Sequence, residues 1–238
     1  MSGQFSGKTV MITGAAGAVG SAVVRKFATE GANLVLVDLH REGAEKLAQE
    51  MGLTSVLILA ADMGQPDAAD EAVTQAEARF GTIDALAHIA GGFAMGDPVH
   101  AGNIDVFERM IYLNARLTYV ACGRVARSMV EKEVAGSIVA VLARSGLKGG
   151  KNMAAYTASK AAAQRIMESM AQELMPHNIR VNGIMPSTVD TPANRRDMPN
   201  ADFSKWVSPA QLAETIAFLS SDAASAITGE SLGVYHKA

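Results

Sequence analysis

Short apolar runs alternate with longer amphipathic stretches along the chain. Seven runs rich in Val, Ile, Leu and Ala predict β-strands. Most of these runs are continuously apolar rather than alternating, which is typical of strands covered on both faces, as in a parallel sheet. The predicted strands are Thr9–Thr13, Asn33–Asp38, Ser55–Leu59, Ile83–Ile89, Ser137–Leu142, Ile179–Met185 and Ser231–Tyr235.

The stretches between these runs predict six helices. They are Ala18–Glu30, Glu42–Met51, Asp67–Phe80, Ile104–Glu131, Met153–Met175 and Pro209–Ser220. Alternating strands and helices indicate βαβ units, so we expect an α/β fold with a Rossmann-like, doubly wound, seven-stranded parallel sheet flanked by helices. With 238 residues, the chain is expected to form one domain over residues 1–238.

Composition narrows the classes of partner. The formal net charge is −3 and no basic stripe occurs, so neither nucleic acid nor a membrane is expected as a partner. The single cysteine, Cys122, lies in an apolar run and fits a packed residue in a reducing compartment. No signal peptide precedes the first strand, and Val56–Ala61 is far too short to span a bilayer, so we expect a cytoplasmic protein. No His or Cys spacing predicts a metal site.

The first predicted strand leads into a glycine-rich turn, from Gly14 through Gly17 to Gly20, and then into a helix. Glycine permits a tight turn and close approach of a pyrophosphate, and a helix N-terminus offers unpaired N–H groups and partial positive charge. The stretch therefore predicts a phosphate-binding turn.

An acidic residue ends the second predicted strand. Asp38 lies 18 residues beyond Gly20, close to the spacing expected of a carboxylate that binds the adenosine ribose. A carboxylate there repels a 2′-phosphate, which favours NAD(H) over NADP(H). Arg41 is close enough in sequence to reach a 2′-phosphate, so NADP(H) stays the alternative. A plain helix-capping role is the other interpretation of Asp38.

Small or polar residues follow the third and fourth strands. Asp62 and Met63 are expected to border the adenine ring, although Asp62 also suits a turn. Ala90, Gly91 and Gly92 leave room for a cofactor to cross the strand end.

Tyr156 and Lys160 stand four residues apart, so on a helix they share one face. A lysine ammonium beside a tyrosine hydroxyl favours the phenolate and lowers the tyrosine pKa, which is an acid–base device. The alternative is an Ala-rich packing helix with one surface tyrosine and one surface lysine.

Taken together, these motifs resemble the short-chain dehydrogenase/reductase family over essentially the whole chain. The resemblance lies in the glycine turn, Asp38, Asp62, Ala90-Gly91, Asn114, Tyr156-x-x-x-Lys160 and Pro186…Thr191. It implies a NAD(P)-dependent oxidoreductase in which Tyr156 donates a proton, Lys160 lowers its pKa and binds the nicotinamide ribose, and Asn114 holds a water of the proton relay. The implied cofactor-binding residues are Gly14, Gly17, Ala18, Val19, Gly20, Asp38, Leu39, Asp62, Met63, Ala90, Gly91, Tyr156, Lys160, Pro186, Thr188, Val189 and Thr191.

The chain departs from the family pattern in three places. The middle glycine of the turn has moved to Gly17, leaving Ala18, and His88-Ile89 replaces the usual Asn-Asn pair. The position 13 residues before Tyr156, where the family has its catalytic serine, is Ala143. Ser145 is the nearest hydroxyl.

These departures resemble the dihydropteridine reductase branch of the family. The same branch is similar in Gly92-Phe93 and in the run Asp190–Trp206, which falls in a substrate lid that we place at about residues 187–208, the lid segment. The resemblance implies an NADH-preferring reductase of a quinonoid dihydropteridine or a similar conjugated acceptor. The residues expected to face the substrate are Gly92, Phe93, Ala143, Ser145 and Trp206.

Residues Asn194–Trp206 lack helical periodicity and predict a mobile loop. Within it, Phe203 and Trp206 either close over a flat ring or fix the loop to the core.

Two other functions stay open. One is a carbonyl or 3-oxoacyl reductase in which Ser145 or a water replaces the missing serine. The other is a non-catalytic, dinucleotide-binding member of the family. The resemblance also implies a homodimer or homotetramer formed through the helices Ile104–Glu131 and Met153–Met175.

Overall fold

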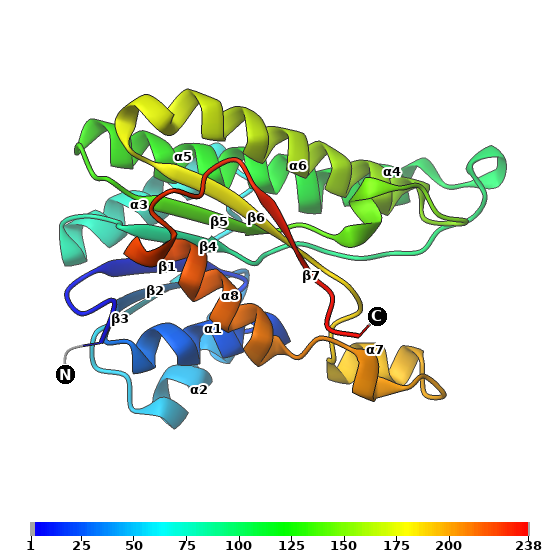
Figure 1. The fold of residues 1–238 in the computed structure, drawn as a ribbon, viewed down its shortest axis with the longest axis horizontal. Helices are drawn as coiled ribbons and strands as arrows, with labels where there is room; N and C mark the ends of the chain where they lie inside the picture. Colours follow the sequence, from blue (N-terminus) through cyan, green and yellow to red (C-terminus); the bar gives the residue numbers. More distant parts are fainter. Residues whose placement is uncertain (1–2, 238) are drawn as a thin grey trace.

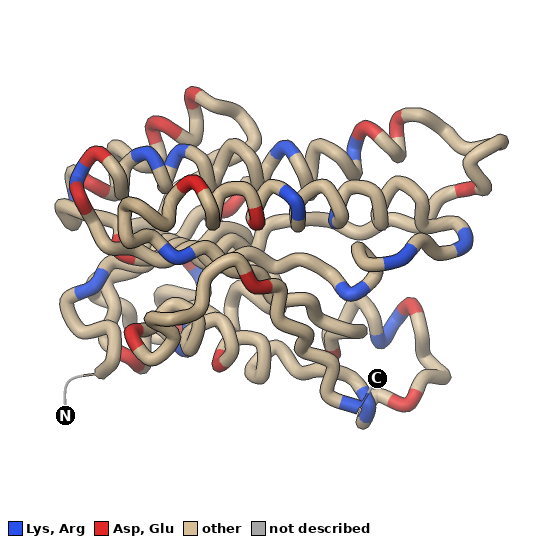
Figure 2. Tube along the Cα trace, turned by 45° about the horizontal axis from the view of Figure 1, so that its top comes forward, with Lys and Arg blue, Asp and Glu red and all other residues tan. Residues whose placement is uncertain are grey.

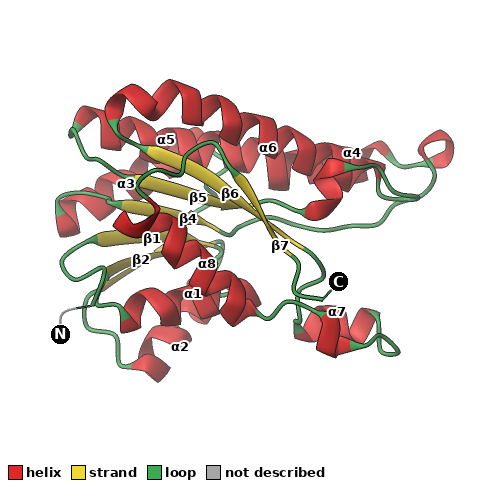
Figure 3. Ribbon diagram, in the orientation of Figure 1, coloured by secondary structure: helices red, strands yellow, loops and turns green. Residues whose placement is uncertain are grey.

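A computed structural model describes residues 3–237. Its centre is a seven-stranded, fully parallel sheet with strand order β3-β2-β1-β4-β5-β6-β7, shown as the yellow arrows of Figure 3. The strands are β1 (Thr9–Thr13), β2 (Asn33–Asp38), β3 (Val56–Ala60), β4 (Ala85–His88), β5 (Ser137–Val141), β6 (Arg180–Pro186) and β7 (Ser231–Val234).

Helices cover both faces of the sheet (Figure 1). Their bounds are α1 (Ala18–Thr29), α2 (Arg41–Met51), α3 (Pro66–Phe80), α4 (Ile104–Met110), α5 (Leu117–Glu131), α6 (Ala154–Leu174), α7 (Pro192–Asp197) and α8 (Pro209–Ser220). Buried side chains form two apolar clusters. One joins the sheet to α3, α5 and α6, and the other joins it to α1, α2 and α8. The near-continuous burial of β1, β2 and β4 follows from this double cover.

The strand order reverses beside β1. After β3 at one edge, the chain crosses to the other side of β1 and forms β4, so Thr13 pairs with Val37 on one side and with His88 on the other. The connections after β1 and β4 therefore diverge at the carboxyl edge. In doubly wound sheets this is where ligands bind.

The predicted fold class is confirmed, and every predicted strand is present within two residues at each end. The prediction of one helix over Ile104–Glu131 is only partly right. A π-helical segment, η2 (Ile111–Arg116), separates α4 from α5. A π-helix differs from an α-helix in its i→i+5 hydrogen bonds, and six residues are too few for the hydrophobic pattern to reveal the change.

The prediction of a loop without helix over Asn194–Trp206 is wrong at its start, because α7 extends to Asp197. The Thr191 hydroxyl accepts a hydrogen bond from the Asn194 N–H, and Pro192 occupies the first turn, where its missing N–H costs nothing. A six-residue helix is too short to produce a periodic pattern.

Acidic and basic residues are interspersed over the described chain (Figure 2). Within residues 3–237, no helix is both long enough and apolar enough to cross a membrane. The same residues contain no group of three or more His, Cys, Asp and Glu side chains that could hold a metal ion.

Candidate active site

Two glycines of the first turn are required by the backbone. Gly14 has φ +67°, and a Cβ on it would lie 2.9 Å from the Ala90 backbone nitrogen. A Cβ on Gly20 would lie 2.0 Å from the Gly14 carbonyl oxygen. Any side chain at these positions would push the turn away from β4 or from α1.

Gly17 has a different role. Its φ is −69°, which any residue adopts, and a Cβ on it would touch only the Gly14 oxygen, at 3.4 Å. Gly17 is the N-cap of α1, no side chain caps the helix, and its first turn holds no acidic residue. The N-terminal N–H groups of α1 are therefore available to an anionic ligand.

A cavity of about 720 Å³ opens at the carboxyl edge of the sheet, beside this turn. The predicted cofactor residues that line it are Gly14, Gly17, Ala18, Val19, Gly20, Asp38, Leu39, Asp62, Met63, Ala90, Gly91 and Thr191. Five predicted cofactor residues are not among those that line it: Tyr156, Lys160, Pro186, Thr188 and Val189. The structure adds Ala16, Tyr112 and Arg196, which no sequence motif indicated.

Both oxygens of Asp38 are fixed by the backbone. Oδ1 accepts the Leu39 N–H at 2.8 Å, and Oδ2 accepts the Ala16 N–H at 2.9 Å. Arg41 instead pairs with Glu45, its Nε 2.9 Å from Oε1. The carboxylate is thus held at the cavity wall while the nearby arginine is engaged on α2.

Each Asp62 oxygen accepts a hydrogen bond from a protein group, which agrees with its interpretation as a turn residue. Its oxygens accept the Gly64 N–H at 2.9 Å and the Tyr112 hydroxyl at 2.6 Å. Burial, reinforced by the Asp62 carboxylate, raises the pKa of Tyr112 above its ordinary value.

Lys160 is a buried cation, 7% exposed, on α6. Its Nζ donates a hydrogen bond to the Val141 carbonyl at 2.8 Å. Burial lowers its pKa to about 8. A Cβ on Gly91 would lie 3.3 Å from this Nζ and 2.9 Å from Asn114 Oδ1, so glycine lets the strand end approach both groups.

Asn114, in η2, fastens the loop after β4. Its amide nitrogen donates to the Gly92 carbonyl at 2.9 Å and to Ser159 Oγ at 3.0 Å, and its Oδ1 accepts the Gly92 N–H at 3.0 Å. The side chain therefore joins β4, η2 and α6 at one point.

Tyr156 does not show the lowered pKa that its spacing from Lys160 predicts. Burial raises its pKa, and a hydrogen bond with the Ser145 side chain opposes the rise. Desolvation of the phenolate is the larger of these two effects, and Lys160 contributes to neither. The Phe93 ring meets the Tyr156 ring edge-on, with centroids 4.8 Å apart, and is 57% exposed.

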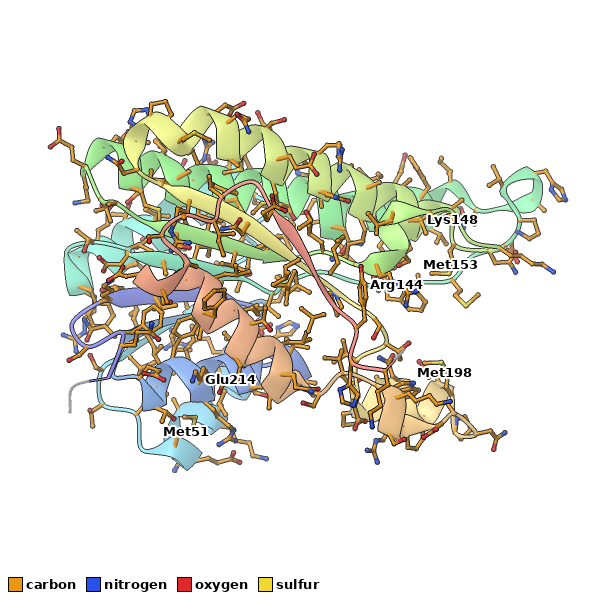
Figure 4. All side chains as sticks on the ribbon, viewed as in Figure 1. Met51, Arg144, Lys148, Met153, Met198 and Glu214 are labelled. Atoms are coloured by element: carbon orange, nitrogen blue, oxygen red, sulfur yellow. The ribbon has the colours of Figure 1, made fainter. Side chains whose placement is uncertain are left out.

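The other residues expected to face a substrate divide into two groups. Ala143 and Ser145 follow β5 at the same edge, next to Arg144, which Figure 4 labels. Trp206 is only 8% exposed and is not among the residues that line the cavity. The burial of Trp206 agrees with fixing the segment to the core, and its ring lies 4.7 Å from that of Phe203 within the same segment.

His88, which replaces the first asparagine of the family pattern, is fully buried in β4. Its Nδ1 lies 2.9 Å from Thr13 Oγ1, a hydroxyl that also accepts the Ala90 N–H at 3.2 Å. Burial lowers the pKa of His88 to about 3, so the ring is neutral and joins β1 to β4 as a hydrogen-bonded core residue.

Comparison with known proteins agrees with this geometry. A family model described as short chain dehydrogenase matches residues 8–202. Trans-4-hydroxycyclohexanecarboxylate dehydrogenase of Sinomonas cyclohexanicum is 31% identical over 245 residues, covering 98% of this chain and 93% of the relative. L-rhamnose 1-dehydrogenase (NAD(P)(+)) of Sphingomonas sp. (strain SKA58) is 32% identical over 244 residues, covering 96% and 94%.

A solved structure is also similar. The 3-ketoacyl-(acyl-carrier-protein) reductase of Brucella melitensis complexed with NADH has a TM-score of 0.88 and 30% identity, covering 97% of this chain and 98% of that one. With the glycine turn, the fixed Asp38 and the Lys160–Asn114–Tyr156 cluster at one sheet edge, these matches identify the family. The chain belongs to the short-chain dehydrogenase family and is an NAD(P)-dependent oxidoreductase of it.

Proposed function

We propose that the protein transfers a hydride between NAD(H) and a small cyclic ketone or alcohol, with Tyr156 as the acid–base group. One observation carries the proposal. Gly91 lines the dinucleotide cavity and also packs against Lys160 Nζ and Asn114 Oδ1, so one end of the cavity meets the polar cluster. A dinucleotide whose pyrophosphate lies on the α1 N-terminus directs its nicotinamide to this end.

A bound nicotinamide dinucleotide supplies the hydride for reduction and accepts it for oxidation. Tyr156 donates the proton to the substrate oxygen. Lys160 keeps two N–H donors beyond the one given to the Val141 carbonyl, and these suit the nicotinamide ribose. Asn114 holds a water of the relay, and Pro186, Thr188 and Val189 approach the nicotinamide from the end of β6.

Ser145 supports a carbonyl or alcohol substrate. Its side chain forms a hydrogen bond with Tyr156, so a second hydroxyl lies where a substrate oxygen would be polarised and protonated. We propose that it replaces the serine missing at Ala143. The reported relatives are named for a hydroxycyclohexanecarboxylate and for rhamnose, which are both hydroxylated cyclic compounds.

A quinonoid dihydropteridine is the second candidate substrate. The exposed Phe93 ring beside Tyr156 offers a flat apolar surface, and the Ala143 methyl suits an acceptor that needs no serine donor at this position. This acceptor is already electrophilic, so a hydride and one proton from Tyr156 suffice to reduce it without a serine donor. A non-catalytic role is disfavoured because Tyr156, Lys160 and Asn114 are all retained.

The test compares NADH oxidation with a cyclic ketone and with quinonoid dihydropterin, in the wild type and in Ser145→Ala. Ser204→Ala, in the lid segment, is the control. We expect ketone reduction that Ser145→Ala lowers by about 10²-fold, the magnitude of one lost oxyanion donor. Fast pterin reduction with an inert ketone and no effect of Ser145→Ala would establish the second candidate instead.

We further propose that the chain forms one domain with residues 187–208 as the substrate lid, and that it assembles as a homodimer or homotetramer. Apolar side chains on α4 and α5 stay exposed, Ile104 at 63%, Phe107 at 43% and Tyr119 at 68%. Light scattering after size-exclusion chromatography measures the oligomeric state.

A further inference from the structure

The dinucleotide cavity has a strongly asymmetric set of charges. Among the residues described as lining it, Arg196 is the one Lys or Arg, whereas Asp38 and Asp62 supply carboxylates. A dinucleotide brings the two negative charges of its pyrophosphate into this space. The N-terminus of α1 offers only partial positive charge, so a full cation at the same cavity can pair with pyrophosphate charge that the helix leaves unneutralised.

Arg196 comes from the lid segment. Thr191, Pro192, Ala193 and Arg196 all line the cavity, and Arg196 lies on the same side of α7 as residues 192 and 193 because it follows them by four and three positions. In Figure 1, α7 lies beyond the carboxyl edge of the sheet, away from the body of the helical layers. The segment thus presents its basic side chain across the cavity from the sheet.

The two neighbouring arginines of α7 are used differently. Arg195 forms a bidentate salt bridge with Asp190, with Nε 2.6 Å from Oδ1 and Nη2 2.8 Å from Oδ2. Its guanidinium lies 4.7 Å from the centre of the Phe203 ring. Within residues 3–237, no carboxylate pairs with Arg196 and no hydrogen bond occupies its guanidinium. Arg195 holds the lid segment together, and Arg196 keeps all its donors for a ligand.

We propose that Arg196 binds the pyrophosphate of the dinucleotide and so fastens the lid segment over the bound cofactor. This inference rests on the proposed dinucleotide site but not on the proposed substrate. Because Arg195 links α7 to Phe203, and Phe203 packs on Trp206, engagement of Arg196 is transmitted to the environment of the only tryptophan.

The experiment measures the dissociation constants of NADH, NADPH, ADP-ribose and adenosine by calorimetry, for the wild type, Arg196→Gln and Lys205→Gln. Lys205→Gln is the control with the same charge change, since Lys205 lies in the lid segment, 60% exposed, and does not line the cavity. We expect Arg196→Gln to weaken NADH, NADPH and ADP-ribose about tenfold, the value of one charge-assisted hydrogen bond. The dissociation constant of adenosine should change less than twofold in Arg196→Gln, and those of all four ligands should change less than twofold in Lys205→Gln. Arg196→Lys should recover part of the lost affinity.

Trp206 emission supplies a second readout without a nicotinamide ring. Saturating ADP-ribose should change this emission in the wild type and in Lys205→Gln, but not in Arg196→Gln at equal occupancy. Equal losses in Arg196→Gln and Lys205→Gln would overturn the inference, as would a loss confined to NADPH, which would assign Arg196 to a 2′-phosphate. If NADH binds but no acceptor is reduced, the proposed substrate fails while the comparison of variants still decides the role of Arg196.

Discussion

Lys160 illustrates how a single residue serves the site at a cost to the fold. Its ammonium is buried, and within residues 3–237 its only hydrogen bond goes to the Val141 carbonyl. Its pKa is about 8 in the folded protein against an ordinary value of 10.5, so the folded state binds the proton less tightly than the unfolded chain. That difference corresponds to about 3 kcal/mol at neutral pH.

Lys160→Met should make this cost measurable. Below about pH 8 the lysine is charged in both states and the full cost applies, whereas above that pH the folded state releases its proton first, so wild-type stability rises toward pH 10.5. We expect the wild type to gain about 2 kcal/mol relative to the variant between pH 7 and pH 10. Urea unfolding at both pH values measures it, and a constant difference would contradict the buried charge. Turnover should be lost.

We propose that the preference between NAD(H) and NADP(H) depends on Asp38. Its carboxylate is held at the cavity by two backbone N–H groups, and Arg41 is engaged with Glu45. Asp38→Ser removes the charge that repels a 2′-phosphate, so the ratio of NADPH to NADH affinity should rise at least about tenfold. Asp67→Ser, an exposed change in α3 with the same charge difference, is the control and should leave the ratio unchanged.

At the scale of elements, glycines of the first turn serve two different needs, the packing of α1 on the turn and the approach of a ligand, and the sequence does not show which glycine serves which. Gly20 is needed for α1 to pack on the turn, since its Cβ would lie 2.0 Å from the Gly14 oxygen. Gly17 has room for a Cβ in the protein itself, at 3.4 Å from its nearest neighbour. We propose that Gly17 allows the close approach of a ligand to the α1 N-terminus.

The two glycines should therefore respond differently to alanine. Gly20→Ala should lower the free energy of unfolding by about 2–4 kcal/mol, because only backbone atoms are available to move. Gly17→Ala should cost about 1 kcal/mol or less, since alanine is a poorer N-cap than glycine, but should weaken NADH binding. Denaturant unfolding and NADH titration distinguish them. Equal losses of stability would show that Gly17 is also needed for packing.

For the whole molecule, the site exists because the parallel sheet brings the ends of β1, β4, β5 and β6 to one edge. Asn114 bonds to both Gly92 and Ser159, so η2, the β4 loop and α6 are tied together. Binding of a dinucleotide across these elements opposes their separation, and this links cofactor affinity to global stability.

NADH at one hundred times its dissociation constant should raise the free energy of unfolding by about 2.7 kcal/mol. Tyr156→Phe keeps the ring and the lining of the cavity, so it should retain this gain while turnover falls about 10²–10⁴-fold. Unfolding with and without NADH, beside steady-state rates, checks both values. Full turnover in Tyr156→Phe would remove the tyrosine from the proton-transfer step.

Much of this protein was determined by local sequence. Continuous apolar runs predicted the strand bounds to within two residues, because a strand buried on both faces is apolar at nearly every position. The glycine turn and Asp38 are predictable as a binding motif because their chemistry depends on positions close together in the chain. Tyr156 and Lys160 are predictable as a pair because one helical turn joins them.

Other features were decided only by tertiary structure. The π-helical turn at Asn114, the partnership of Tyr112 with Asp62, and the direction of the Tyr156 pKa all depend on burial and on residues distant in sequence. The same holds for Arg196 and Ser145, whose positions are set by where α7 and the end of β5 lie. Desolvation and contacts between elements depend on all the residues that surround a group in space, many of them distant in sequence. These neighbours decide the pKa values and hydrogen bonds of this site.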